Sequence, residues 1–113
     1  MRLECEADKR AWADVVDVWT RRMLSEFGDL LMAALRGEEG ADDKVKEFYR
    51  CTVKDASITD ADGAEYRGLD AILDVQAGSG MDNVDAAVAS FWGNLPYQAY
   101  RARQSLGNAK RVG

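Results

Sequence analysis

Apolar residues recur at helical spacing between Thr20 and Gly37, in "TRRMLSEFGDLLMAALRG". At ~100° per residue they fall within one sector roughly 140° wide: Met23, Leu24, Phe27, Leu30, Leu31, Ala34 and Leu35. Thr20 has the side chain of an N-cap, and Gly37 begins the polar stretch "GEEGADD". The pattern predicts an amphipathic helix, and we expect most of its apolar face to pack inside the domain.

Weaker patterns predict the remaining elements. "WADVVDVWT" is too short for a helix and is interrupted by Asp14 and Asp17, so it indicates a short strand or extended segment. "TDADG", from Thr59 to Gly63, has the composition of a turn. The predicted helices cover about 43–53, 69–76 (followed by "AGSG"), 82–95 with Asp82 as cap, and 96–106 ending at Gly107.

These elements predict one mainly α domain over residues 1–113, a compact bundle of four to five short helices with a short extended N-terminal segment. Residues 1–19 would form the extended segment, 20–106 the helical core and 107–113 a basic tail.

The composition is that of an ordinary globular protein, with 47% hydrophobic and 31% charged residues. A net charge of −5 argues against nucleic-acid binding through a broad basic face. The charge is uneven, because Asp85 is the last acidic residue and Arg101, Arg103, Lys110 and Arg111 follow it. No apolar run has the ~20 residues of a membrane span. We therefore expect a cytoplasmic protein with two free thiols, Cys5 and Cys51.

Catalytic and metal-binding patterns are missing from the sequence. The chain contains no histidine, which is the commonest general base and metal ligand. Aligning Gly63 with the glycine of a calcium-binding EF-hand loop puts Ile58 and Leu69 at the first and last ligand positions, where oxygen ligands are required. We therefore expect a non-enzymatic protein with neither cofactor nor metal.

The last predicted helix carries two different sides. Leu95, Ala99, Ala102 and Leu106 form an apolar stripe that should be buried. Tyr97, Tyr100, Arg101 and Arg103 then turn outward, a composition typical of protein interfaces, and Met32 could extend such a surface. The alternative is that the tyrosines cover a neighbouring helix. We predict a protein partner and homo-oligomers in which the basic tail of one copy meets the acidic body of the next.

The order of elements resembles that of tail assembly chaperones of long-tailed bacteriophages: an extended segment leading to "WT" and a long helix, a second helix, "ITDADG", and short helices through "NLP". The resemblance covers about Val15 to Leu106. It implies a non-enzymatic protein of the host cytoplasm that binds the tape-measure protein during tail assembly. Two alternatives stay open: a virion structural protein, such as a head–tail connector or neck subunit, and a small cytosolic enzyme or regulator.

Overall fold

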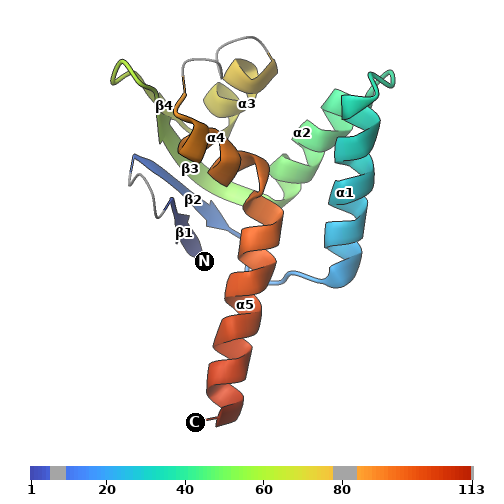
Figure 1. Cartoon of the computed structure of the whole chain (residues 1–113), viewed down its shortest axis with the longest axis vertical. Helices are drawn as coiled ribbons and strands as arrows, with labels where there is room; N and C mark the ends of the chain where they lie inside the picture. Colours follow the sequence, from blue (N-terminus) through green and yellow to red (C-terminus); the bar gives the residue numbers. More distant parts are fainter. Residues whose placement is uncertain (6–9, 78–83, 113) are drawn as a thin grey trace.

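Four short strands form one antiparallel sheet, and five helices accompany it (Figure 1). This holds for residues 1–5, 10–77 and 84–112, which the computed structural model describes, with side chains for all of them except 75–77 and 105–112. The elements in chain order are β1 (Arg2–Glu4), β2 (Ala11–Val15), α1 (Arg21–Leu35), α2 (Ala41–Thr52), β3 (Val53–Thr59), β4 (Glu65–Arg67), α3 (Leu69–Ala77), α4 (Ala86–Gly93) and α5 (Leu95–Val112).

The predicted mainly α bundle is therefore wrong, because the domain is mixed α/β. The sheet has the order β1-β2-β3-β4, and all neighbouring strands are antiparallel. The sequence pattern indicated an extended segment only before Thr20. It missed β3, in which Ala56 and Ser57 are too small to mark an apolar face, while three-residue strands such as β1 and β4 are too short to show alternation.

One face of the sheet forms the floor of the core. Ala11, Ala13 and Val15 of β2 are fully buried, whereas Trp12 and Asp14 between them are only half-buried. The period of two is that of a strand packed on one side. The buried face meets apolar side chains of the helices: Phe27, Val45, Tyr49, Ile72, Leu73, Val88, Phe91, Trp92, Leu95 and Ala99.

Tyr49 and Trp92 form a buried aromatic pair in this core. Their rings stack with centroids 4.9 Å apart, and the Tyr49 hydroxyl donates a hydrogen bond of 2.8 Å to the Trp92 carbonyl oxygen. The hydroxyl is thus satisfied inside the core, as buried polar groups require. Burial raises the pKa of Tyr49, because the phenolate would lose its solvation there.

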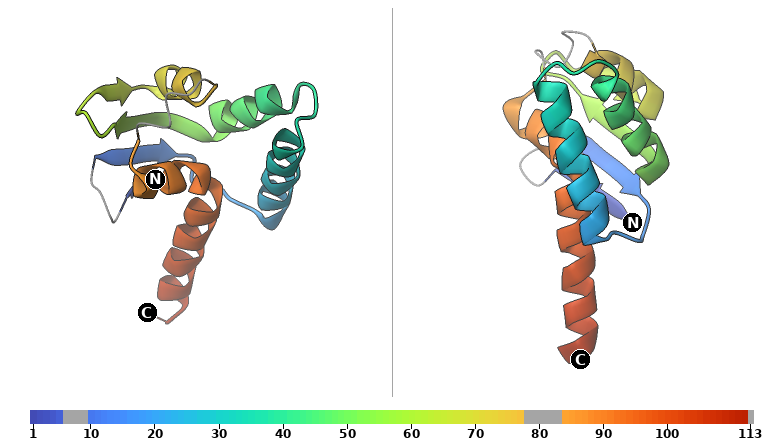
Figure 2. Two further views of the ribbon diagram at one scale, coloured as in Figure 1. Left: turned by 45° about the horizontal axis from the view of Figure 1, so that its top comes forward. Right: turned by 90° about the vertical axis from the view of Figure 1, so that its right-hand side faces the viewer.

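The first two helices form a hairpin, and their boundaries agree closely with the sequence prediction (Figure 2). The Thr20 side chain accepts a hydrogen bond from the Met23 backbone N–H at 3.2 Å, which confirms the predicted N-cap. Gly37 has a φ of +73°, the left-handed conformation that commonly ends a helix. Only Phe27 of the α1 apolar face is fully buried; Met23, Leu30, Leu31 and Ala34 are half-buried against the core.

The predicted turn at Thr59–Gly63 is confirmed as the connection between β3 and β4. The buried Asp60 carboxylate accepts hydrogen bonds from the backbone N–H groups of Asp62 and Ala64, both at 2.9 Å, and from the Tyr66 hydroxyl at 3.2 Å. The pKa of Tyr66 is raised, mainly because its hydroxyl donates this hydrogen bond to Asp60, and also because of burial and the negative charges of Asp60 and Asp62. Gly63 supplies the positive φ of +87° that the turn needs.

The last helix is longer than predicted. It continues through Gly107 to Val112, so the expected end at Gly107 is wrong and residues 107–112 belong to α5. One glycine costs a helix only about 1 kcal/mol and does not by itself end it. The cap expected at Asp82 and most of "AGSG" lie outside the described residues. In both figures the C-terminal half of α5 extends beyond the other elements (Figures 1 and 2).

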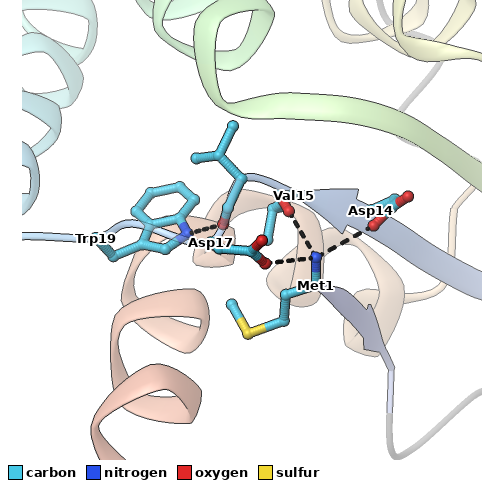
Figure 3. A network of polar contacts seen from close by, with 6 residues as sticks. Met1, Asp14, Val15, Asp17 and Trp19 are labelled. Carbon is cyan, nitrogen blue, oxygen red and sulfur yellow. Dashed lines mark hydrogen bonds and ion pairs between the residues drawn. The ribbon is translucent and has the colours of Figure 1, made fainter.

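Met1, directly before β1, bonds to the segment that leads into α1 (Figure 3). Its amino group donates hydrogen bonds to the Val15 carbonyl oxygen at 2.9 Å and to the Asp17 carboxylate at 3.1 Å. This hydrogen bond and the positive charge of the amine lower the pKa of Asp17. The Trp19 indole N–H donates to the Val16 carbonyl oxygen at 2.7 Å. These contacts fix β1 at the edge of the sheet.

Candidate functional site

The end of α1 carries the largest exposed apolar side chains of the described chain. Leu35 is 74% exposed and Met32 54% exposed; Val18, at 69%, lies apart from them before α1. Met32 and Leu35 are three residues apart and Leu31 and Leu35 four apart, so their side chains are neighbours on the helix surface. Isolated exposed leucines are ordinary, but a contiguous apolar patch usually marks a binding surface.

A groove of about 500 Å³ lies beside this patch, between α1 and α2. We call it the hairpin groove. Its lining consists of Leu31, Ala34, Leu35, Gly40, Asp42, Asp43, Val45 and Lys46. The apolar members come from facing sides of the two helices, and the polar members come from the first turns of α2 and from its N-cap.

The sequence explains how α2 begins beside the groove. Gly40 caps α2 in the left-handed conformation, with a φ of +78°, and a Cβ at this position would meet no atom within 4 Å. Glycine is thus needed for its backbone freedom rather than for close packing. Asp42 and Asp43 stabilise the positive end of the α2 dipole and also give this end of the groove its charged rim.

Two predicted interface residues, Tyr97 and Tyr100, do not turn outward. Both are half-buried against α1, so the outward orientation that we expected is wrong. The Tyr97 ring meets Phe27 edge-on with centroids 5.7 Å apart, and the Tyr100 hydroxyl accepts a hydrogen bond from Arg21 Nε at 3.3 Å. Helix α5 is therefore packed on two sides, along its apolar stripe and along its tyrosines. Periodicity shows which stripe of a helix is apolar but not which other element lies along its flank.

Arg101 lines a second, larger groove of about 910 Å³ between β1, α4 and α5. We call it the sheet-edge groove. Leu3, Phe91 and Ala102 supply its apolar floor, and Tyr97 reaches it from α5. The Gln98 amide donates a hydrogen bond to the Phe91 carbonyl oxygen at 3.2 Å, which ties α5 to α4 beneath the groove.

The remaining predicted residues lie apart from one another. Arg103 is exposed on α5, and its charge contributes to the low pKa of Asp17. Met32 lies next to the hairpin groove on a different helix. The predicted residues thus do not form one surface. Of the predicted apolar face of α1, Leu31 packs partly against the core whereas Leu35 is exposed. Helical spacing alone cannot distinguish a buried apolar position from one left uncovered.

Potential metal ligands do not cluster among the described residues. No group of three or more histidine, cysteine, aspartate or glutamate side chains among them could hold a metal ion. Both cysteines are free, Cys5 buried and Cys51 exposed. No helix within the described ranges has the length and apolar character of a membrane span.

Comparison of the chain with models of protein families, with curated proteins and with solved structures gives no match. The fold and the two grooves therefore describe a small α/β domain with candidate binding surfaces for other chains, and its function has to be argued from those surfaces.

Proposed function

We propose that this chain is a non-enzymatic protein-binding module that holds an amphipathic helix of a partner protein in the hairpin groove. The observation that carries the proposal is the position of Leu35 and Met32, which are 74% and 54% exposed at the margin of the hairpin groove. Leaving such side chains in water is unfavourable, and covering them is worth about 25 cal/mol per Å² of apolar surface.

The shape of the groove favours a helix as its ligand. Its apolar lining residues come from two neighbouring helices, an arrangement in which a third helix can lay its apolar face along both. The charged side chains at the rim, Asp42, Asp43 and Lys46, would face the polar flanks of the incoming helix. The flexible thioether of Met32 suits a surface that adapts to its partner.

The resemblance to tail assembly chaperones gives this proposal its most specific form. In that form the partner is the tape-measure protein, and the chain shields apolar helical segments of it in the host cytoplasm until the tail is assembled. The open apolar end of the helix hairpin supports this role, because a chaperone of this kind needs a surface for a helical client.

The experiment that tests the proposal uses Leu35→Asp and a matched control, Val18→Asp. Both side chains are highly exposed, so both variants should fold, and each places a new charge on the surface. The probe is a bacteriophage tape-measure protein, co-expressed with this chain and recovered by affinity purification. Leu35→Asp should lose the complex at least about tenfold, a loss of ~1.4 kcal/mol, while Val18→Asp should retain it.

Two results would remove the proposal. If both variants recover the partner as well as the unaltered chain does, the hairpin groove is not the binding surface. If the chain remains a stoichiometric component of purified particles, it is a structural subunit rather than an assembly chaperone.

A further inference from the structure

The strand β1 is an open edge of the sheet, since no strand among residues 1–5, 10–77 and 84–112 pairs with its outer side in the order β1-β2-β3-β4 (Figure 1). Hydrogen bonds join the Cys5 N–H to the Ala11 carbonyl oxygen at 3.0 Å and the Val15 N–H to the Met1 carbonyl oxygen at 2.8 Å. Backbone groups alternate in direction along an antiparallel strand. The N–H and C=O groups of Arg2 and Glu4 therefore point away from β2.

We propose that this edge pairs with the β1 strand of a second copy of the chain, which forms a symmetric dimer with a continuous sheet across the interface. In an antiparallel pair centred on Leu3, Arg2 of each copy lies opposite Glu4 of the other. These are the residues whose backbone groups point outward, so the pair forms four backbone hydrogen bonds.

The charges of β1 select this register. Centring the pair on Arg2 would oppose two arginines, and centring it on Glu4 would oppose two glutamates, which is unfavourable on neighbouring strands. Only the register centred on Leu3 places opposite charges together. Short charged edge strands usually discourage pairing. Here the two charges have opposite signs and lie two residues apart, so β1 is complementary to itself.

The other face of the pair is apolar. Leu3 is half-buried and lines the sheet-edge groove, so in the proposed dimer it meets Leu3 of the second copy at the open side of that groove. On the opposite face the Arg2 guanidinium lies 4.0 Å from the centre of the Trp12 ring, which keeps this charge on the uncovered surface of the sheet. The edge is also held in place by Met1, which directly precedes β1. Its amino group contacts the Val15 carbonyl oxygen and the Asp14 carboxylate at the end of β2 (Figure 3).

Charge reversal tests this arrangement. Sedimentation across a wide range of concentration should show a monomer–dimer equilibrium for the unaltered chain. Arg2→Glu and Glu4→Arg should each weaken dimerisation at least about tenfold, because two attractive charge pairs become repulsive. The double variant Arg2→Glu/Glu4→Arg should restore the dimer, since it exchanges the two charges. Circular dichroism verifies that each variant folds.

A cross-link gives an independent measurement of the register. Directly opposed residues outside the hydrogen-bonded pairs have Cα atoms about 4.5 Å apart, within the range that a disulfide spans. With Cys51 replaced by serine, Leu3→Cys should form a disulfide between copies, whereas Glu39→Cys, on an exposed turn, should not. A monomer at every concentration, a dimer indifferent to the single reversals, or a double variant that stays monomeric would each overturn the proposal. Each of these outcomes leaves the hairpin groove and its partner unaffected.

Discussion

Truncating Phe27 and Leu31, two apolar residues of α1, should have very different effects on stability. Phe27 is fully buried, and its ring lies 5.3 Å from that of Phe48, 5.8 Å from that of Tyr49 and 5.7 Å from that of Tyr97, centre to centre. Phe27→Ala would leave a cavity where α1, α2 and α5 meet. Such substitutions cost about 3–5 kcal/mol.

Leu31 lies one turn further along α1 but lines the open hairpin groove. Burying a whole leucine side chain is worth about 1.5–3 kcal/mol, and Leu31 is only half-buried. Its truncation widens a groove that solvent already reaches, so no closed cavity adds to the cost. We expect Leu31→Ala to lose about 1 kcal/mol, less than the ~2–5 kcal/mol that a core position would give.

Urea unfolding at equilibrium, followed by tryptophan fluorescence, measures both free energies. The slope of the unfolding free energy against urea should be the same for both variants and for the unaltered chain, so that the midpoints alone report stability. For a domain of this size the difference between the variants corresponds to roughly 8–16 °C in melting temperature. Equal losses for the two variants would show that the groove is closed in solution and that Leu31 belongs to the core. That result would also remove the binding surface on which the proposed function depends.

Three further predictions concern other parts of the molecule. The raised pKa of Tyr49 means that only the unfolded chain ionises this hydroxyl readily, so its contribution to stability is complete below pH ~10, the ordinary tyrosine pKa, and falls as the pH rises above it. In urea unfolding at several pH values, Tyr49→Phe should weaken this alkaline dependence and leave the part that comes from the raised pKa of Tyr66, and an unchanged dependence would contradict the assignment. Asp60→Ala should lower the free energy of unfolding by about 2–4 kcal/mol, because three hydrogen bonds to the carboxylate disappear, whereas Asp60→Asn should lower it less. Equal losses of the two variants in thermal unfolding would mean that the charge of Asp60, and not its acceptor oxygens, stabilises the turn. Thiol labelling of the native protein should modify Cys51 rapidly and Cys5 only after unfolding, and equal labelling rates would place Cys5 at the surface.

The sequence by itself determined the local elements whose causes are local. The α1 boundaries follow from the Thr20 cap and from the left-handed Gly37, and the β3–β4 turn follows from the Asp60 side chain bonding to its own backbone. The absence of histidine was equally plain. These features depend on residues a few positions apart, which periodicity and capping rules can detect.

The tertiary structure decided which surfaces are covered. Strand β3 contains little apolar pattern of its own and exists because it pairs with β2 on one side and β4 on the other. Tyr97 lies inward because α1 happens to pass along the flank of α5, and Leu35 is left exposed because no described element reaches the end of the hairpin. A repeat of apolar residues shows that a helix has an apolar face. Only the packing of distant segments determines whether the chain itself covers that face or leaves it for a partner.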